Sequence, residues 1–406
     1  MNSFTSRRIP AEGTSVRVLI HYSVLNRGGA EKSILRLLSA LADRGCEVHL
    51  VLTSAGGALE GAVDPRVTIH HLRTMSKWML AGSAPMFDKL VRAGKWLVGR
   101  SQEAWRRRQF RRVAFDVAFC GSAGLSPDFV CQTVDARKRF VFVRSDPVMV
   151  SDARWGGNVR RFHQRIDAYL CVSDSVRRSM QRQYPQTRGK CITAYNLLNS
   201  DAMRAQADGQ PNPFEEYRGV PCVLSVCRLQ EISKGLLRMV EVHRRLLDAG
   251  VPHVWHVLGG GPDHDLLKQA IHAGGLSETF KLHGAVDNPR FPYYMYADIC
   301  AVLSRYEGLC GVVNEARVLE RPVIATRFAG IEEQIENGVN GMIVEQNVDA
   351  ICDGPSSLIR DAGLRARLAQ GGYPRALLDD EAKVNALLEL MSHDKYENED
   401  RSFRQH

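Results

Sequence analysis

The stretch from Ile299 to Thr326 restricts the possible folds more than any other part of the sequence. An apolar run, Ile299–Leu303, has the length of a buried strand and leads into a loop that contains glycine. A helical stretch follows and ends at Arg321-Pro322, because proline cannot continue a helix, and Val323–Thr326 then resumes as a strand. Strand, loop, helix and strand in this order predict a βαβ unit of a parallel sheet.

Two glutamates and two glycines give this βαβ unit its chemical character. We place Glu307 in the loop and Glu315 about two turns into the helix. Gly308 and Gly311 have no side chain, so a ligand can approach the main chain there. The first N–H groups of the helix have no partner within the helix and form an anion site. This edge of the sheet is therefore predicted to bind an anionic ligand.

Length and composition define the class of protein. The 406 residues exceed a typical single core and suggest two domains, and 44% hydrophobic residues indicate a globular chain. No apolar run is long enough to span a bilayer, and Met1–Ser15 is not typical of a signal peptide. The ten cysteines form no C-x2-C pair, so we do not expect a zinc site. We expect a reducing, cytoplasmic compartment. The net charge of +9 favours an anionic partner.

The same strand-and-helix rhythm occurs in both halves of the chain. Val16–Tyr22 and Val48–Leu52 read as strands that flank a glycine-rich turn and an amphipathic helix, which is a doubly wound opening. Gln206–Val220 is polar and rich in helix breakers, and Pro221–Cys227 then restarts the pattern as a strand. We therefore expect two doubly wound α/β domains, with residues 1–205 as the first, 206–375 as the second, and 376–406 as a helix that crosses back to the first domain plus a polar tail.

Glu307, seven residues and Glu315 together resemble the Glu-x7-Glu motif of retaining glycosyltransferases with the GT-B fold. The continuation Arg321–Thr326, followed by Gly330 and Glu333, is similar to the same family's tail. A lone pair of glutamates at this spacing is a weak signal, but the pair within strand, loop and helix is a strong one. The resemblance implies two facing Rossmann-like domains, the first for the acceptor and the second for a nucleotide-sugar donor.

The resemblance also implies roles for single residues. Glu307 would hold hydroxyls of the donor sugar, and Arg228 and Lys234 would stabilise the charge that develops on a departing diphosphate. No metal and no cofactor is required on this account, because fixed cations take the role of a divalent ion. The donor-binding residues that the resemblance implies are Gly28, Gly29, Arg228, Lys234, Glu307, Gly308, Leu309, Cys310, Gly311 and Glu315, with Glu315 on the ribose.

The acceptor side departs from the family pattern. A strand at Arg139–Val143 leads into Arg144-Ser145-Asp146, where many relatives carry a histidine near the reacting sugar, and Arg144 takes that histidine's place. Two interpretations fit: Arg144 binds an anionic acceptor, or it is a structural ion-pair partner of Asp146.

The segment 77–112 interleaves aromatic and aliphatic residues with lysines and arginines at a helical period. Such a stretch can lie in an anionic membrane surface, where each cation contributes about 1 kcal/mol. The same pattern also fits an arginine-rich helix that packs on the first domain. Nucleic acid fits less well, because no known binding module accompanies the charge.

The sequence thus favours a retaining glycosyltransferase that moves a sugar from a nucleoside-diphosphate sugar to a hydroxyl of a glycan or lipid-linked acceptor, in cell-surface polysaccharide or glycolipid synthesis. We expect it in the cytoplasm, peripheral at the inner face of the membrane. The alternatives are a nucleotide-sugar epimerase on the same fold and a non-catalytic basic membrane-binding protein. Asp263-x-Asp265 follows a Gly-Pro turn and starts a helix, so we do not assign it a metal.

Overall fold

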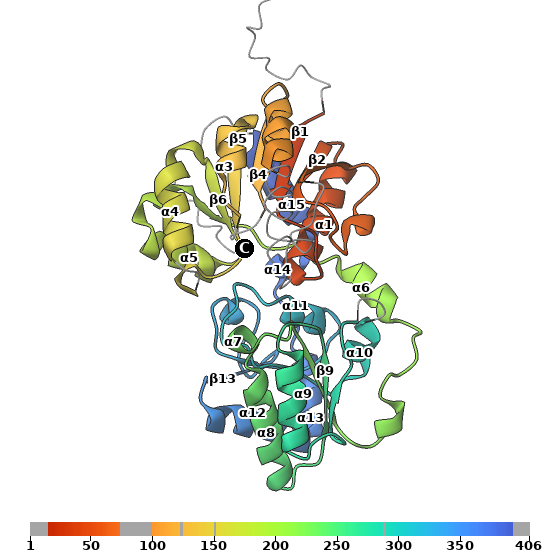
Figure 1. Ribbon diagram of the computed structural model, residues 1–406. Coiled ribbons are helices and arrows are strands. Elements are labelled where there is room, and N and C mark those ends of the chain that lie inside the picture. Colours follow the sequence, from red (N-terminus) through yellow and green to blue (C-terminus); the bar gives the residue numbers. More distant parts are fainter. Residues whose placement is uncertain (1–14, 74–99, 122–124, 150–151, 287–289, 393–406) are drawn as a thin grey trace, which may run out of the picture. The chain divides into compact units, whose positions relative to one another are not determined.

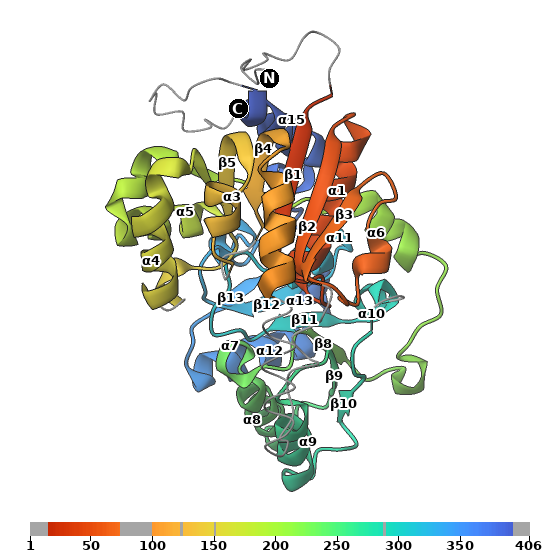
Figure 2. The same ribbon diagram turned by 45° about the horizontal axis from the view of Figure 1, so that its top comes forward.

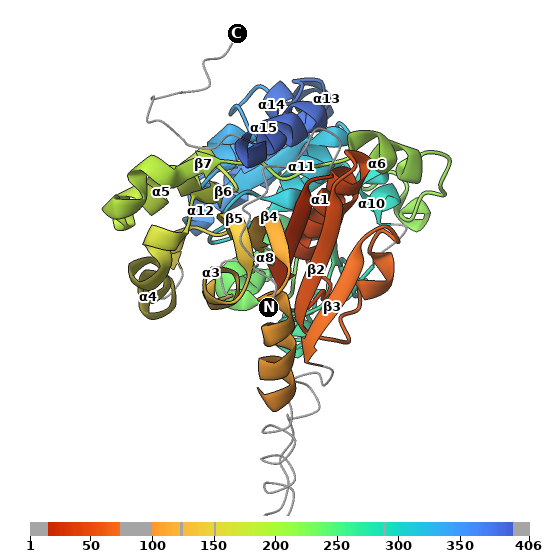
Figure 3. The ribbon, with the colours of Figure 1, turned by 90° about the horizontal axis from the view of Figure 1, so that it is seen from above.

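The structure is a computed structural model that describes residues 15–73, 100–121, 125–149, 152–286 and 290–392. Within these ranges the strands form one seven-stranded and one six-stranded sheet. The seven-stranded sheet has the order β3-β2-β1-β4-β5-β6-β7, and Figure 3 shows β2 beside β3 and β4 beside β5. Its strands are β1 (Arg17–Tyr22), β2 (Glu47–Ser54), β3 (Thr68–Arg73), β4 (Ala114–Cys120), β5 (Asp135–Val143), β6 (Ala168–Cys171) and β7 (Cys191–Thr193).

The six-stranded sheet has the order β10-β9-β8-β11-β12-β13, and every neighbouring pair of its strands is parallel. The chain moves outward from β8 in one direction and then returns to β11 on the other side of β8. This reversal is the topological switch point at which doubly wound sheets bind ligands. The strands are β8 (Cys222–Val226), β9 (Val254–Leu258), β10 (Phe280–Leu282), β11 (Ile299–Val302), β12 (Val323–Thr326) and β13 (Met342–Val344).

Helices connect the strands in both sheets. Figures 1 and 2 show α8 and α9 side by side. With the seven-stranded sheet the chain forms α1 (Gly29–Asp43), a helical stretch at residues 100–110, α3 (Asp128–Gln132), α4 (Asp152–Phe162) and α5 (Asp174–Gln183). The later helices are α6 (Ser200–Ala207), α7 (Glu231–Lys234), α8 (Leu236–Asp248), α9 (His264–Ala273), α10 (Phe291–Tyr296), α11 (Gly311–Val318), α12 (Val348–Arg360), α13 (Ala362–Ala369), α14 (Arg375–Leu378) and α15 (Asp380–Ser392).

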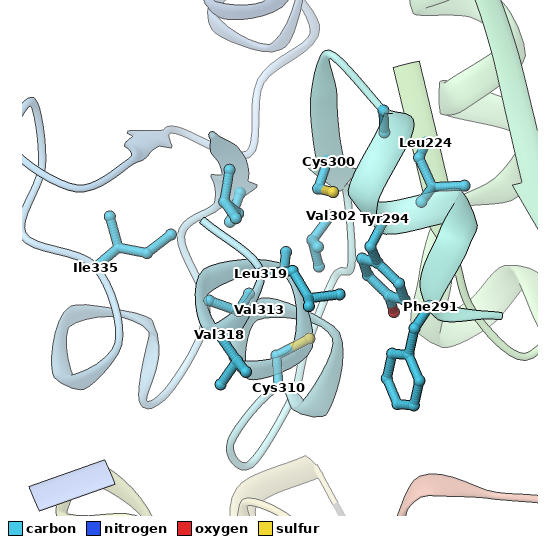
Figure 4. Close-up of a cluster of buried hydrophobic side chains, with 14 of the residues drawn as sticks. Leu224, Phe291, Tyr294, Cys300, Val302, Cys310, Val313, Val318, Leu319 and Ile335 are labelled. Carbon is cyan, nitrogen blue, oxygen red and sulfur yellow. The ribbon is translucent and has the colours of Figure 1, made fainter. Parts of the chain in front are cut away.

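Strand alternation divides the core of the six-stranded sheet into two layers. Val223 and Ile299 face a cluster with α8, α9 and α12, whereas Leu224 and Cys300 face a cluster with α6, α10 and α11. Successive side chains of a strand point to opposite faces, so both faces of this parallel sheet are covered. Figure 4 shows the second cluster, in which side chains of α10 and α11 meet those of β8 and β11.

By contacts the described chain forms two compact units. The first contains the chain up to Phe142, Arg154–Leu170 and the chain from Ala386 on; the second contains Val143–Ala153 and Cys171–Asn385. Grouping by contact does not define a domain boundary, so the division at residues 205 and 375 stays a prediction.

One local expectation was wrong, and two elements were not predicted. The strand β3 was not predicted, because its stretch Thr68–Arg73 contains two histidines and is mostly half-buried. Glu315 lies only a little more than one turn into its helix, because α11 begins at Gly311. An aspartate, Asp361, accepts a hydrogen bond from Leu364 N and starts α13, so the stretch after α12 is a separate helix.

Candidate functional site

The site lies at the carboxyl edge of the six-stranded sheet, where the chain reverses its direction of winding. Ile299 of β11 pairs with Val223 of β8, so the loops that follow these two strands leave the sheet side by side. The loop after β8 carries Arg228 and ends in α7, and the loop after β11 carries Glu307 and ends in α11. The predicted order of strand, loop, helix and strand around Glu307 is confirmed.

Lys234 and Glu307 meet at this edge. The Lys234 ammonium donates a hydrogen bond to Glu307 Oε1, and Ser304 Oγ donates to the same oxygen at 2.8 Å. The two charged side chains are only 19% and 17% exposed, so water screens the pair weakly. Burial lowers the pKa of Lys234, but the Glu307 carboxylate counteracts it and the net pKa lies above the ordinary 10.5. The site thus presents a lysine ammonium paired with a glutamate side chain.

Two cysteines line the small cavity beside this pair, which has a volume of about 10 Å³ and holds roughly one water molecule. Burial raises the pKa of both thiols to about 12, for Cys227 and for Cys310. A thiol attacks as its thiolate, so neither group is a nucleophile at neutral pH. The chemistry of the site therefore depends on charge and hydrogen bonding.

The four residues before and at the start of α11 have different roles in the structure. A Cβ on Gly308 would lie 2.5 Å from the Arg144 carbonyl oxygen, whereas a Cβ on Gly311 would meet nothing within 4 Å. The main chain of residue 144 therefore fills the space on the Cβ side of Gly308, and ligand approach to the main chain of Gly308 stays a prediction. Gly311 is open and exposed, and Leu309 is buried.

Gln334 holds the loop from behind. Its Oε1 accepts from Cys310 N at 2.9 Å, and its Nε2 donates to Cys310 O at 2.8 Å. The Cys310 N–H is therefore already engaged and does not point to a ligand. Gln334 is fully buried, and its amide also donates to Asn314 on α11. These bonds fix the conformation of the loop that leads into α11.

Arg228 and Glu315 lie on the same unit but in different surroundings. Arg228 is exposed on the turn before α7. Glu315 is largely buried, with its side chain 14% exposed, and forms an ion pair with Arg290 at 2.7 Å. Glu315 is thus held by Arg290, a cation that was not predicted from the sequence.

The segments around Arg144 and Asp146 also belong to this unit. Arg144 Nη1 donates to Asn196 at 2.8 Å, and Asp146 Oδ1 accepts from Ser179 Oγ at 2.6 Å and from Val148 N at 3.0 Å. Asp146 therefore orders its own turn and attaches it to α5. The acceptor-side role of both residues stays a prediction.

A second set of contacts attaches the start of α5 to the loop. Ser173 Oγ donates to Gly308 O at 2.8 Å. Ser173 is also the N-cap residue of α5, and its Oγ accepts from Val176 N. Glu333 accepts from Asp174 N at 2.8 Å and from Ser175 N at 2.7 Å, so a carboxylate occupies the helix N-terminus.

Gly28 and Gly29 begin α1 in the other unit. Gly28 is the N-cap residue, and the carboxylate of Glu31 occupies the place where a Cβ on Gly28 would lie. Gly29 has open space around it. The structure describes each unit by itself, so a contact of these glycines with a donor stays a prediction.

Three residues of the site were not predicted from the sequence: Gln334, Glu333 as a helix cap, and Arg290. Gln334 had one readable signal, since it shares a helical face with the apolar Ile331 and Ile335, and a polar residue in such a place is buried with partners. The sequence gives no signal for the role of Arg290, because a single arginine before an apolar stretch is common.

Two doubly wound units, one with a charged pair and an open helix N-terminus at its switch point, define the GT-B class of proteins. Sequence profiles specify it further. Residues 27–201 match the profile "Glycosyltransferase Family 4" and residues 220–361 match "Glycosyl transferases group 1". The chain therefore belongs to these glycosyltransferase families, and both the predicted family and the predicted fold class are confirmed.

Individual relatives are similar over part of their length. The alpha-D-kanosaminyltransferase of Streptomyces kanamyceticus is 27% identical over 236 residues, which are 57% of this chain and 59% of that protein. The lipopolysaccharide core biosynthesis glycosyltransferase LpsE of Rhizobium meliloti is 29% identical over 175 residues, 42% of this chain and 50% of that protein. The chain thus spans about half the length of the curated relatives it matches.

Solved structures resemble the chain over nearly its whole length. Anabaena HepE in complex with UDP and glucose has a TM-score of 0.72 at 16% identity, and the match covers 93% of this chain and 99% of that one. S. aureus TarM, in a complex that contains UDP, has a TM-score of 0.70 at 12% identity, covering 93% and 100%. At this identity the likeness shows the fold. None of the helices in the described ranges combines the length and apolar character that crossing a bilayer requires.

Proposed function

We propose that this chain transfers a sugar from a nucleoside-diphosphate sugar to a hydroxyl of a glycan or lipid-linked acceptor, with retention of the anomeric configuration, in cell-surface polysaccharide or glycolipid synthesis. The observation that carries the proposal is the meeting of Lys234 and Glu307 at the switch point, beside the open N-terminus of α11. This arrangement suits a ligand with both an anionic and a hydroxyl-rich part.

The diphosphate end of the donor fits the cations. Negative charge grows on the bridging oxygen as the glycosidic bond breaks, and a fixed cation in a site of low water content stabilises that charge. Lys234 is such a cation, and Arg228 is an exposed second one that can close over the phosphates. Gly311 contributes an open approach to the first N–H groups of α11, where anions bind.

The sugar end fits Glu307, whose carboxylate accepts hydrogen bonds from hydroxyls once the donor separates it from Lys234. The two cysteines in the cavity are neutral, and we assign no covalent intermediate. Retention then follows from attack on the same face as the departing diphosphate, with a phosphate oxygen accepting the proton of the acceptor hydroxyl. Glu315 is assigned to the ribose hydroxyls.

We also propose that the reaction requires no metal or other cofactor. Within the residues that the structure describes, no group of three or more histidine, cysteine, aspartate or glutamate side chains lies close enough to hold an ion. Asp263 Oδ2 accepts from Glu231 N at 2.7 Å, so it acts as a cap of α7. A chelator provides the test of metal dependence.

Membrane attachment forms a separate part of the proposal. Residues 77–99 of the basic segment 77–112 lie outside the described residues. In the described remainder Trp105 is 61% exposed, and Arg108 and Arg111 are exposed as well, whereas Arg107 pairs with Asp128 at 2.7 Å. An exposed tryptophan among cations fits an anionic bilayer surface, and this supports a cytoplasmic protein peripheral to the membrane.

The experiment measures thermal unfolding with uridine, guanosine and adenosine diphosphates and their sugars, with and without EDTA. A ligand at 100 times its Kd stabilises the native state by about 2.7 kcal/mol. We expect a shift with one nucleotide that EDTA leaves unchanged and that Lys234→Ala removes. Arg244→Ala is the matched control, because Arg244 also pairs with a glutamate, Glu241 at 2.9 Å, but on an exposed face of α8.

Product analysis completes the test. Incubation with the donor that binds and with glycan and lipid-linked hydroxyl acceptors is expected to release the nucleoside diphosphate and form a product whose anomeric configuration equals that of the donor. An inverted product contradicts the retaining mechanism, and interconversion of the sugar without an acceptor favours the epimerase. Absence of any nucleotide effect, together with sedimentation on anionic vesicles that Trp105→Ala weakens, favours the non-catalytic membrane protein.

A further inference from the structure

Arg290 forms a two-point contact with the carboxylate of Glu315. Its Nη2 lies 2.7 Å from Oε1 and its Nε lies 3.2 Å from Oε2. The arginine side chain is 8% exposed and the glutamate side chain 14%. A planar guanidinium that contacts both oxygens fixes the plane of the carboxylate as well as its position.

Tyr294 contributes a third donor to the same carboxylate. Its hydroxyl lies 2.9 Å from Glu315 Oε2, and its ring is fully buried in the core cluster of α10 and α11. Figure 4 shows the ring near Leu319, with Phe291 below it. Burial and the neighbouring Glu315 carboxylate raise the pKa of Tyr294 well above its ordinary value, so the hydroxyl keeps its proton and donates.

The local chain holds both donors rigidly. Arg290 stands at the N-cap of α10, where Pro292 fixes the first turn, and Tyr294 follows one turn later on the same helix face. The guanidinium carbon of Arg290 also lies 4.3 Å from the ring centre of Phe291. Donors from α10 therefore meet an acceptor on α11, and the two helices share one core.

Stability alone explains this arrangement poorly. Removing two charges from water costs several kcal/mol per ion, and well-packed apolar residues often replace a buried ion pair without loss. A buried carboxylate with three donors instead has a fixed orientation. Such a carboxylate is suited to recognise hydroxyl groups at its partly exposed edge.

We propose that Arg290 and Tyr294 are positioning residues that hold the Glu315 carboxylate oriented toward the ribose hydroxyls of the donor nucleotide. This inference rests on the proposed function, in which Glu315 binds the ribose. A site built to accept hydrogen bonds from hydroxyls rejects an analogue that lacks them, because its own polar group then loses a partner. Arg290 and Tyr294 thus set the preference for a ribonucleotide over a dideoxyribonucleotide.

The test compares the affinity of a nucleoside diphosphate with that of its 2′,3′-dideoxy counterpart by calorimetry. The probe is uridine or guanosine diphosphate, whichever binds the wild type. The wild type is expected to prefer the ribonucleotide, and Arg290→Met to lower this preference about tenfold, which equals about 1.4 kcal/mol. Tyr294→Phe keeps the buried ring and removes only the hydroxyl, so it is expected to give a smaller decrease, and Arg290→Lys to restore part of the preference.

A merely structural role predicts a different pattern. If Arg290→Met and Tyr294→Phe weaken both nucleotides equally and leave their ratio unchanged, the positioning role is wrong. Thermal unfolding of each variant verifies that it is folded, and Tyr294→Phe serves as the readout if Arg290→Met does not fold.

Glu315→Gln separates this inference from the proposal beneath it. If Glu315→Gln removes the preference for the ribonucleotide and Arg290→Met does not, the proposed function stands and the positioning role is overturned. If Glu315→Gln itself leaves the preference unchanged, the assignment of Glu315 to the ribose is wrong, and the inference is overturned with it.

Discussion

Two buried histidines of the second unit, His243 and His253, are expected to make its stability depend on pH. His243 and His253 are joined at 2.8 Å, and His253 Nδ1 lies 2.8 Å from the Val251 carbonyl, which can only accept. His253 therefore carries its proton on Nδ1, and His243 donates from Nδ1 to His253 Nε2. The Thr279 hydroxyl then donates to His243 Nε2 at 2.9 Å, so both rings are neutral.

The size of the effect follows from the pKa of His243. Burial, and then the charge of His253, lower this pKa from 6.5 to about 3. The unfolded chain binds the proton below pH 6.5 and the folded chain does not, so the stability is complete above pH 6.5 and is lost as the pH falls toward 3. For each such histidine the free energy of unfolding falls by about 1.4 kcal/mol per pH unit below pH 6.5, and the loss at pH 5 is about 2 kcal/mol.

The measurement is urea unfolding between pH 8 and pH 4.5, followed by tryptophan fluorescence. Trp255 is a suitable reporter, because it is fully buried and its ring centre lies 6.1 Å from that of His243. His243→Gln retains a donor and an acceptor but does not titrate, so we expect the slope below pH 6 to decrease by about 1.4 kcal/mol per pH unit. Carboxylates titrate alike in the wild type and in His243→Gln, so their contribution cancels in the difference between the two slopes. An unchanged slope refutes the assignment of a neutral, buried His243.

Two further predictions concern the loop before α11. Gly308→Ala places a Cβ 2.5 Å from the Arg144 carbonyl oxygen and is expected to lower the free energy of unfolding by roughly 1–3 kcal/mol. Gly311→Ala lies in open space at a helix start, so it is expected to leave the free energy of unfolding unchanged or to raise it, and to weaken nucleotide binding. Urea unfolding and calorimetry of both variants test this, and equal losses of stability contradict it. Gln334→Leu leaves the N–H and C=O of Cys310 without their partner and is expected to cost roughly 2–5 kcal/mol in urea unfolding, so a loss below 1 kcal/mol contradicts the role of this amide.

The elements of the site were predictable because their signals are local. Alternating or continuous apolar runs, and the glycine and proline that interrupt them, predicted β8, β11 and the loop that carries Glu307. The pairing of β8 with β11 follows from the doubly wound order, which brings Lys234 to Glu307 across 73 residues. Fold class and the central charged pair therefore follow from pattern and topology together.

The partners of the site were not predictable, because they depend on contacts between distant segments. A carbonyl from residue 144 lies close to where a Cβ of Gly308 would stand, and the local sequence around Gly308 does not indicate this contact. Gln334 and Arg290 reach Cys310 and Glu315 over 24 and 25 residues, and nothing in either residue type specifies that partner. A single sequence shows which residues have polar groups to satisfy, but not with which residue they do so.

Pro355 shows the limit of a local rule. Proline is tolerated in the first turn of a helix, but Pro355 lies inside α12, which begins at Val348. Its ring is buried with Gly354, and a Cβ on that glycine would lie 2.5 Å from Ile324. Close packing on the sheet thus keeps a helix continuous through a residue that on its own favours interruption.

The attachment of α5 to the Glu307 loop limits how the protein can be divided or recombined. A fragment that begins at residue 206 lacks the N–H groups that bind Glu333, the hydroxyl of Ser173 that binds Gly308 O, and the carbonyl of Arg144 that covers Gly308. Exchange of the second half between relatives therefore has to preserve the surface formed by residues 143–149 and 171–196. The second half is thus a module only together with a part of the first half.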